Sequence, residues 1–373
     1  MAKRSDLLIR LFFTWHAGQA PVEDAGFKVP VSWDIPLTEG YNFEVVSNVA
    51  SDPGTHHFLG LQNPSLVEQV TAWRPDVVHI TGWAWLSHLQ AMRDFYRRGT
   101  PTLFRGDSHL LNQIQSGPSW WLKRFVLRHV LSWPTAFLAV GKANCAYYEA
   151  FGIGSDRVYL CPHSIDVARF AEPAMVLEQQ AAQWRLELGI TSDQCVLLFA
   201  GKFEPKKRPI ELMRAVQTSP NRRLMLVMVG GGELGQEVKS IANSDPDRFR
   251  LLPFQNQSRM PVVYRLGDLF VLPSAFGETW GLAVNEALAC GRPVLVSDRV
   301  GCAPDIVNEA VGKVFSWSDA SSLTRAITTI TGDRYKLLQM GRAAAKSASS
   351  FDVARTEVCF MDALNAVCGE RRA

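Results

Sequence analysis

Residues 268–297 restrict the fold of this chain more than any other segment. Residues 268–274 form a short apolar run closed by proline and serine, which is typical of a buried parallel strand that ends in a loop. Residues 282–289 favour a helix, and Gly291 ends it just before the next apolar run, 293–297. The order strand, glycine loop, helix, strand predicts an α/β fold with this loop at the carboxyl end of a parallel strand.

Two carboxylates flank the start of the predicted helix. Glu278 lies in the glycine loop, and Glu286 lies about two turns into the helix, roughly 12 Å further along if all intervening residues are helical. They are too far apart to share one proton or one metal ion, and they suit the two ends of an elongated ligand. The first amides of the helix, from Gly281 onward, can hold a diphosphate. Together these features indicate a nucleotide-sugar site.

Glu278 and Glu286, with seven residues between them, match the E-x7-E motif of retaining glycosyltransferases of family 4 (the GT4 type). Further segments resemble other motifs of that family in order and spacing, over about residues 195–315, and the resemblance is weaker in the N-terminal half. These segments are 196–209, 226–233, 250–254 and 301–307. The resemblance implies the GT-B fold, an α/β fold in which two Rossmann-like domains face each other across a cleft and a C-terminal helix crosses back to the first domain.

The resemblance also implies roles for single residues. Glu286 would bind the nucleotide ribose, Glu278 would contact the transferred sugar, and Lys202 with Lys207 would bind the diphosphate. The family usually has arginine at the position of Lys202, so a bidentate guanidinium is replaced by a point charge. Lys206 and Arg208 are candidates to supply part of the positive charge. The implied donor-binding set is Glu286, Gly277, Trp280, Gly281, Leu282, Gly201, Lys207 and Phe254. Taken alone, residues 206–208 would instead be interpreted as a solvated loop.

Residues 105–109 follow a predicted strand, where many relatives carry a histidine loop near the transferred sugar. Depending on the register, Asp107 or His109 takes the place of that histidine, and both are candidate catalytic residues beside Glu278, Lys202 and Lys207. The alternative is that Asp107 caps the following helix and that His109 is an ordinary surface residue.

The candidate acceptor contacts are Arg105, Gly18 and His163. Gly18 would do part of the work of a Gly-Gly loop that this chain lacks, and His163, beside a proline, is equally interpreted as structural. No cofactor and no obligatory metal are implied, because lysines and a helix N-terminus can stabilise the leaving diphosphate. The proton of the acceptor would pass to the leaving phosphate. A covalent glycosyl intermediate is the alternative, although no second carboxylate is evident for it.

The length of 373 residues and a hydrophobic content of 47% allow two domains. We expect an acceptor domain at 1–170, completed by a helix at 351–373, and a donor domain at 171–350, with a linker near 169–180. A net charge of only +3 argues against a nucleic-acid-binding surface. Seven scattered cysteines without C-x-x-C spacing, and an apolar run at 7–13 too short for a signal core or a membrane span, favour a cytoplasmic protein.

Short apolar runs in the N-terminal half, separated by stretches long enough for helices, predict a further parallel sheet. The candidate strands are 7–13, 43–46, 76–80, 102–104 and 136–140. Residues 119–133 combine tryptophans, aliphatic residues and basic residues at helical spacing. This segment either lies on an anionic membrane surface or forms a core helix with a basic outer face.

The expected function is retaining transfer of a sugar from a nucleotide diphosphate sugar to a glycan or lipid-linked glycan acceptor. The expected setting is cell-surface polysaccharide or lipopolysaccharide biosynthesis, and the protein would contact the inner face of the membrane if residues 119–133 lie on it. Two other classes stay open, a nucleotide-binding, non-catalytic subunit of the same fold and a dinucleotide-dependent oxidoreductase. The glycine loop at 230–232 favours the oxidoreductase, but G-x-G-x-x-G is not completed there.

Overall fold

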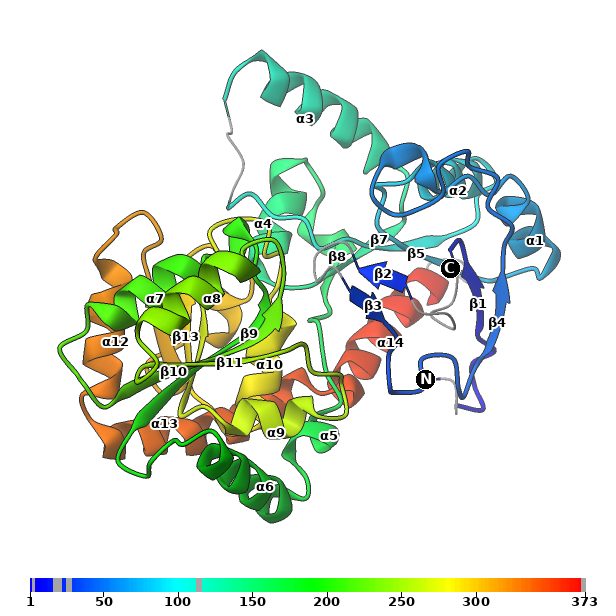
Figure 1. The fold of residues 1–373 in the computed structure, drawn as a ribbon. Helices are drawn as coiled ribbons and strands as arrows, with labels where there is room; N and C mark the ends of the chain where they lie inside the picture. The colour runs from blue at the N-terminus through cyan, green and yellow to red at the C-terminus, as the bar shows by residue number, and fades with distance from the viewer. Residues whose placement is uncertain (2–3, 16–21, 25–28, 112–115, 370–373) are drawn as a thin grey trace. The chain divides into compact units, whose positions relative to one another are not determined.

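The computed structural model describes residues 1, 4–15, 22–24, 29–111 and 116–369 (Figure 1). The chain forms two compact units. Unit 1 consists of Met1–Val22, Pro36–Pro162 and Thr356–Ala373, and unit 2 consists of Glu23–Ile35 and His163–Arg355. The change from one unit to the other thus falls at Pro162, eight residues before the domain boundary that the sequence analysis expects.

Unit 2 is built on a six-stranded sheet in the order β11-β10-β9-β12-β13-β14, and its strand pairs are parallel. Its strands are β9 (Cys195–Lys202), β10 (Leu224–Gly231), β11 (Phe249–Leu252), β12 (Leu269–Leu272), β13 (Val294–Ser297) and β14 (Gly312–Phe315). The two predicted strands at 268–274 and 293–297 are therefore confirmed. Their side chains are buried on both faces of the sheet, which explains why the sequence shows continuous apolar runs there.

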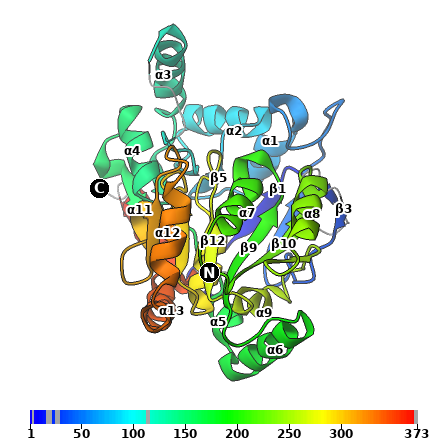
Figure 2. The ribbon, with the colours of Figure 1, turned by 60° about the vertical axis from the view of Figure 1, so that its left-hand side comes forward.

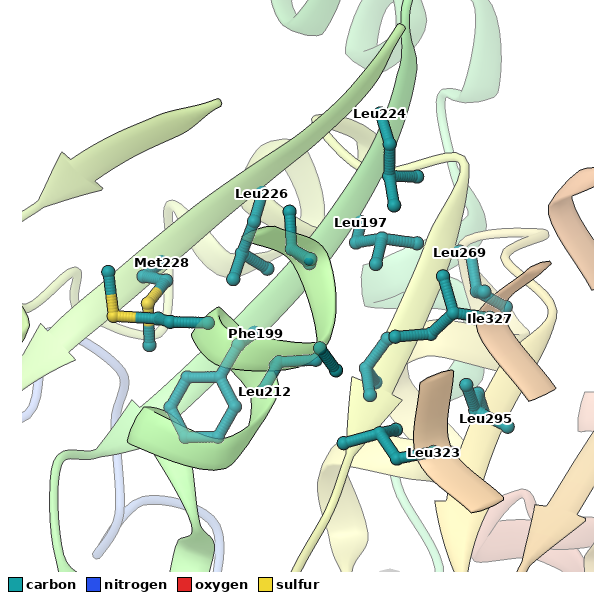
Figure 3. Close-up of a cluster of buried hydrophobic side chains, with 14 of the residues drawn as sticks. Leu197, Phe199, Leu212, Leu224, Leu226, Met228, Leu269, Leu295, Leu323 and Ile327 are labelled. Atoms are coloured by element: carbon teal, nitrogen blue, oxygen red, sulfur yellow. The ribbon is translucent and has the colours of Figure 1, made fainter. Parts of the chain in front are cut away.

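Helices cover both faces of this sheet. Side chains from α7, α8 and α12 meet Leu197 and Phe199 of β9 on one face, as part of the core shown in Figure 3. On the opposite side, α10 contacts β12 and β13. The helices of unit 2 are α5 (Val167–Ala171), α6 (Ala174–Glu187), α7 (Pro209–Gln217), α8 (Gly235–Ser244), α9 (Met260–Arg265), α10 (Leu282–Ala289), α11 (Ala303–Ile306), α12 (Ser322–Thr331) and α13 (Arg334–Ser347). Figure 2 shows α7, α8 and α12 beside the sheet from a second direction.

The segment expected to be a linker is helical and packs onto unit 2. The helices α5 and α6 occupy most of 167–187. Arg265 Nη1 donates to Phe170 O at 2.7 Å, and Arg185 Nη2 lies 2.9 Å from Asp268 Oδ1. These bonds explain why the boundary lies further toward the N-terminus than expected.

Unit 1 contains a four-stranded parallel sheet in the order β5-β6-β7-β8, formed by β5 (Val78–Thr81), β6 (Thr102–Arg105), β7 (Ala136–Ala139) and β8 (Val158–Leu160). The predicted strands at 7–13 and 43–46 appear as β1 (Arg10–Phe13) and β4 (Asn42–Val45), which pair in parallel with each other as a separate two-stranded sheet. The short pair of β2 (Val22–Asp24) with β3 (Val29–Val31), which follows β1 in the chain, belongs to unit 2 except for Val22. The helices of unit 1 before β8 are α1 (Leu66–Ala72), α2 (Leu86–Arg97), α3 (Pro118–Val130) and α4 (Lys142–Ala150).

The C-terminal helix α14 (Val353–Gly369) returns to unit 1, as predicted. Ala363 and Val367 are buried against Leu103 of β6 and Leu138 of β7. Thr356 Oγ1 also donates to Pro162 O at 3.1 Å. The structure thus contains the expected α/β units and the returning helix. Among the described residues, no helix combines the length and apolar character needed to cross a membrane.

Candidate donor site

The strand order of unit 2 reverses between β9 and β12. The chain runs outward from β9 through β10 to β11 and then returns to β12 on the other side of β9. In open parallel sheets, ligands bind outside the carboxyl ends of the strands at such a switch point. The predicted donor-side residues all lie at or after the carboxyl ends of these strands: Gly201, Lys202, Lys207, Phe254, Gly277, Glu278, Trp280, Gly281, Leu282 and Glu286.

Lys207 and Glu278 come from two different loops and meet at this switch point. Lys207 Nζ forms an ion pair with Glu278 Oε2, and Ser274 Oγ donates to the same oxygen at 2.9 Å. The side chains of Lys207 and Glu278 are 19% and 15% exposed, so the pair is shielded but reachable from solvent. The main chains of the two loops are also joined, because Ala275 N donates to Lys206 O at 2.8 Å. The structure therefore brings a predicted cation and a predicted carboxylate into direct contact.

Glycines fix the loop that carries Glu278. Gly281 precedes α10 with a φ of +96°, and a Cβ atom there would lie 3.0 Å from Leu272 Cδ2. A Cβ on Gly301 would lie only 1.8 Å from Thr279 O. Gly301 N donates to Glu278 O at 3.0 Å, which holds the loop from outside. Gly281 favours glycine because of its left-handed φ, and Gly301 needs glycine because another backbone passes where its side chain would start.

Glu286 is nearly buried on α10. Tyr264 Oη donates to Glu286 Oε2 at 2.5 Å. Burial raises the pKa of Glu286 above its ordinary value, while the Tyr264 hydrogen bond and the charge of Arg169 oppose this rise. Arg169 is itself fixed by Gln257, whose main-chain O and Oε1 accept from its guanidinium at 3.1 and 2.9 Å. One oxygen of the carboxylate is thus held in a defined direction, as hydrogen bonding to a ribose requires.

Trp280 lies in the interior with only 3% of its surface exposed. Its Nε1 donates to Asn285 Oδ1 at 3.0 Å, and Asn285 Nδ2 donates to His163 O at 3.2 Å. The His163 ring packs against Trp280 with a centroid distance of 5.9 Å. The indole therefore anchors the start of α10, and a donor contact of Trp280 would involve its main chain.

Glycines occupy three of the last four paired positions at the ends of β9 and β10. Gly201 lies opposite Gly230, which has a φ of +138°, and a Cβ on Gly230 would lie 2.0 Å from Gly201 O. Lys202, the last residue of β9, is opposite Gly231 and only partly buried. Lys202 is the one basic residue of β9 and lies at the carboxyl end of this strand, where the strand order reverses.

The two basic neighbours of Lys207 have other partners. Lys206 Nζ lies 3.0 Å from Glu204 Oε2. Arg208 adopts a left-handed conformation with a φ of +53°, and its guanidinium reaches Glu211 at 3.3 Å and Trp317 O at 3.1 Å. The position of Arg208 therefore does not support the expectation that it supplies part of the positive charge beside Lys202.

The arrangement suits an anionic, elongated ligand. The first turn of α10 contains no acidic residue, so its amides and the positive end of the helix dipole add to the charges of Lys202 and Lys207. Glu286 lies further along the same helix. An Asp-x-Asp triplet at 245–247 precedes β11, at the amino ends of the strands, and so lies away from these residues.

Comparison with known families agrees with this geometry. Residues 26–169 match the family described as Glycosyltransferase Family 4, and residues 180–347 match Glycosyl transferases group 1. The chain belongs to glycosyltransferase family 4. Both halves of the molecule thus match halves of that family, including the N-terminal half in which the sequence motifs are weaker.

Curated relatives and solved structures extend the comparison. The chain is 30% identical over 238 residues to D-inositol 3-phosphate glycosyltransferase of Nocardia farcinica, covering 60% of this chain and 50% of that protein. It is 32% identical over 215 residues to the enzyme of the same name from Saccharomonospora viridis, covering 53% and 49%. The chain spans about half the length of these curated relatives.

Two solved structures share the fold. Sucrose-phosphate synthase from Thermosynechococcus elongatus matches with a TM-score of 0.70 and 16% identity, covering 97% of this chain and 99% of that one. Anabaena HepE in complex with UDP and glucose matches with a TM-score of 0.67 and 19% identity, covering 88% and 87%. At these identities the likeness establishes the GT-B fold.

The predicted acceptor loop of unit 1 is held from several sides. The Tyr148 hydroxyl lies 3.2 Å from both Gly106 N and Gly106 O, and Asn144 Nδ2 donates to Ser108 O at 2.7 Å. His109 is only 6% exposed, and its Nδ1 accepts from Leu111 N at 3.2 Å. The alternative that His109 is an ordinary surface residue is therefore wrong.

The remaining acceptor-side candidates have different environments. Asp107 is exposed, and the described residues directly after it, 108–111, are not helical, so Asp107 does not cap a helix. The Arg105 guanidinium donates to Cys161 Sγ at 3.1 Å and to Pro162 O at 3.2 Å, which ties β6 to the chain after β8. Gly18 lies outside the described residues. His163, described above beside Trp280, belongs to unit 2.

Sequence reasoning missed the residues that orient the candidates. Tyr264 on α9, Ser274 after β12 and Asn285 on α10 all bind members of the predicted set or their anchor. Tyr264 and Asn285 occupy helical positions with ordinary spacing and gave no signal in the sequence. Ser274 closes an apolar run, a position that indicates a strand end but not a hydrogen bond to Glu278.

Proposed function

We propose that this chain transfers a sugar, with retention of anomeric configuration, from a nucleotide diphosphate sugar to a glycan or lipid-linked glycan. The observation that carries the proposal is the ion pair between Lys207 and Glu278 in the loops before α10. On α10 itself, Glu286 accepts a hydrogen bond from Tyr264 of α9. A switch point with cations, helix amides and an oriented carboxylate has the groups that a nucleotide diphosphate requires.

In the proposed reaction, the bond between the anomeric carbon and the diphosphate oxygen breaks, and the acceptor oxygen bonds to the same face of that carbon. Lys207, Lys202 and the first amides of α10 stabilise the negative charge that develops on the leaving diphosphate. The proton of the acceptor hydroxyl passes to a leaving phosphate oxygen. Glu286 accepts a hydrogen bond from the ribose, and Glu278 contacts the hydroxyls of the transferred sugar. No cofactor or metal takes part in this step.

The acceptor is proposed to be a cell-surface glycan or its lipid-linked precursor. The lipopolysaccharide outer core galactosyltransferase WaaB shares the fold with a TM-score of 0.63. A second candidate acceptor is an inositol phosphate, because the curated relatives carry that substrate in their name. Incubating the protein with one activated donor and each acceptor separates the two, since only the true acceptor should yield a new glycoside with release of the nucleoside diphosphate.

The helix α3 supports a peripheral membrane contact. Trp120, Leu127 and Val130 face the interior, but Trp121, Leu122 and Phe125 are 62%, 65% and 76% exposed. The helix contains no acidic residue and carries lysine, arginine and histidine side chains. The alternative of a core helix agrees with the burial of Trp120, Leu127 and Val130, but the outer face of the helix is apolar as well as basic. Apolar side chains beside cations on one helix are the features that bind an anionic lipid surface. We propose that this contact is made with the cytoplasmic face of the membrane.

Co-sedimentation with vesicles tests this contact. Wild-type protein should bind anionic vesicles at low salt, and Phe125→Ser should weaken binding by about tenfold, the equivalent of one buried aromatic side chain. Leu338→Ser, which changes a side chain 63% exposed on α13, is the matched control and should bind as the wild type does. Equal binding by all three proteins would contradict the role of α3.

The transfer proposal is tested first by thermal unfolding with UDP, GDP, ADP and NAD in the presence of EDTA. A ligand that binds only the folded protein raises its unfolding temperature, and one nucleoside diphosphate should do so without metal. A response to NAD alone would favour the oxidoreductase. Nucleotide binding without sugar release from any activated donor would favour a non-catalytic subunit.

A further inference from the structure

A cluster of metal-ligating side chains lies in unit 1, in the loop between β4 and α1. Asp52, His56 and His57 each offer one ligand atom, and these three atoms all lie within 4.8 Å of one another. His56 Nε2 and His57 Nε2 are each 3.2 Å from the same atom, Asp52 Oδ2. We propose that these residues bind a divalent transition-metal ion, with Zn²⁺ as the ion that fits their chemistry best.

The donor set and its spacing agree with zinc. Zinc is bound by imidazole nitrogens and carboxylate oxygens at about 2.0–2.2 Å, which places neighbouring ligand atoms of a tetrahedron roughly 3.3 Å apart. The two distances of 3.2 Å between imidazole nitrogens and the carboxylate oxygen are close to that edge length. Three protein ligands and one water would complete four-fold coordination. The exposure of all three side chains, between 36% and 70%, leaves room for that water.

Binding requires both histidines to change their tautomer. Without an ion, protonated Nε2 atoms donate toward Asp52, and His57 Nε2 also lies 2.9 Å from the main-chain O of Asp52. For metal binding, each imidazole carries its proton on Nδ1 and presents the Nε2 lone pair. The ion then takes the place of the protons between the two rings and the carboxylate.

The loop that carries the cluster is closed before any ion binds. Gly54 N donates to Gly60 O at 3.0 Å, and a Cβ on Gly60 would lie 2.1 Å from Gly54 O. Asn48 Nδ2 also donates to Gly60 O at 2.8 Å, and Trp85 Nε1 donates to Thr55 O at 3.3 Å. The main chain on both sides of the histidines is therefore fixed. A loop held in this way loses little conformational freedom when its side chains bind an ion.

The proposed ion has a structural role in unit 1, and it takes no part in the proposed transfer step. Isothermal titration of the EDTA-treated, buffer-exchanged full-length protein with ZnCl₂ tests it. We expect one equivalent to bind and the unfolding temperature to rise. His56→Asn and His57→Asn should each weaken binding by at least about tenfold, the effect of losing even an outer hydrogen-bond partner of a ligand. His129→Asn, an exposed histidine on α3, should bind zinc as the wild type does.

Two results would overturn the proposal. One is the absence of stoichiometric binding by the wild type, which would leave an ordinary exposed ion pair. The other is wild-type affinity in both histidine variants, which would assign zinc to cysteines elsewhere in the chain. If a variant fails to fold, anomalous diffraction at the zinc edge from soaked wild-type crystals decides. A zinc peak about 2.1 Å from both Nε2 atoms is expected, and peaks only at other places would contradict the site.

Discussion

The strand ends of the two units use their charged residues differently. In unit 2, Lys207 and Glu278 belong to separate loops, pair with each other and stay partly exposed. In unit 1, the Arg105 guanidinium donates to Cys161 Sγ and Pro162 O and so joins two parts of its own unit. A cation in the first arrangement can exchange its partner for an incoming anion. A cation in the second cannot do so without loosening the fold around it.

This difference shows that a basic residue in the expected position is not always free to bind a ligand. Both regions have basic or titratable residues after a predicted strand, and the sequence pattern did not distinguish them. The structure distinguishes them by what each side chain contacts. The following predictions test whether the distinction holds, beginning with the largest expected effect.

Replacing Gly301 by alanine should disrupt the donor loop. The new Cβ would lie 1.8 Å from Thr279 O, so the main chain of this loop must move. We expect a loss of about 3 kcal/mol in unfolding free energy, at the upper end for overpacking, and loss of the nucleotide response. Gly235→Ala is the control, because nothing lies within 4 Å of its Cβ position. Equal denaturation midpoints for the two variants would contradict the role of Gly301.

Lys207→Ala should lower turnover by about 10²-fold or more, as loss of a group that stabilises transition-state charge does. Lys206→Ala is the matched control, since Lys206 pairs with Glu204 at 3.0 Å and should change turnover little. Steady-state kinetics with the donor identified by thermal unfolding provide the measurement. A larger effect at Lys206 than at Lys207 would reverse the assignment of the two lysines.

Arg105→Ala should act on stability and leave the donor site alone. The loss of hydrogen bonds from a charged donor should lower the unfolding free energy by about 1.5–3 kcal/mol. The rise in unfolding temperature caused by the nucleoside diphosphate should stay as in the wild type. If instead the KM for the acceptor rises while the unfolding temperature is unchanged, Arg105 is an acceptor contact and the contrast between the units fails.

Tyr264→Phe should give a smaller effect on donor binding. Loss of one hydrogen bond to Glu286 corresponds to about 0.5–1.5 kcal/mol, or roughly three- to tenfold in affinity. The variant removes the donor that favours the charged form of Glu286, so the pKa of this carboxyl should rise further. Nucleotide affinity should then fall most at acidic pH. Affinity equal to the wild type across the pH range would show that Tyr264 does not position Glu286.

The raised pKa of Glu286 also makes the stability of the folded protein depend on pH. Burial raises the pKa of Glu286 above its ordinary value of 4.5, so the folded protein binds more protons than the unfolded chain just above that pH. Stability from this group is therefore fully present below pH 4.5 and is lost as pH rises through the folded-state pKa. Glu286→Gln should remove this loss, which unfolding temperatures measured from pH 4 to 8 would reveal. An unchanged pH profile in the variant would contradict the raised pKa.

The sequence predicted the parts of the fold that depend on main-chain constraints. Continuous apolar runs identified β9 and β12 because both faces of those strands are buried. Gly281 signalled the start of α10 because its φ of +96° disfavours any residue with a side chain. Such requirements act on residue type directly, so they are visible in a single sequence.

Features that depend on distant partners could not be predicted. Tyr264 contacts Glu286, which lies 22 residues away, and no local pattern records such a hydrogen bond. The expected linker packs onto unit 2 because Arg265 and Asp268 bind it, although both lie far along the chain. The exposure of Phe125 also escaped prediction, since helical spacing alone does not show which face is covered.

The returning helix α14 has a consequence for biosynthesis. Leu103, Leu138 and Cys161 of unit 1 are buried against Ala363 and Val367, which the ribosome adds only after it has made unit 2. Unit 2 lies between these two parts of unit 1 in the sequence, so all of its strands are made before unit 1 can be finished. The unit that is begun first is thus completed last. Until then, the side of its sheet that α14 covers stays exposed to other nascent chains and to chaperones.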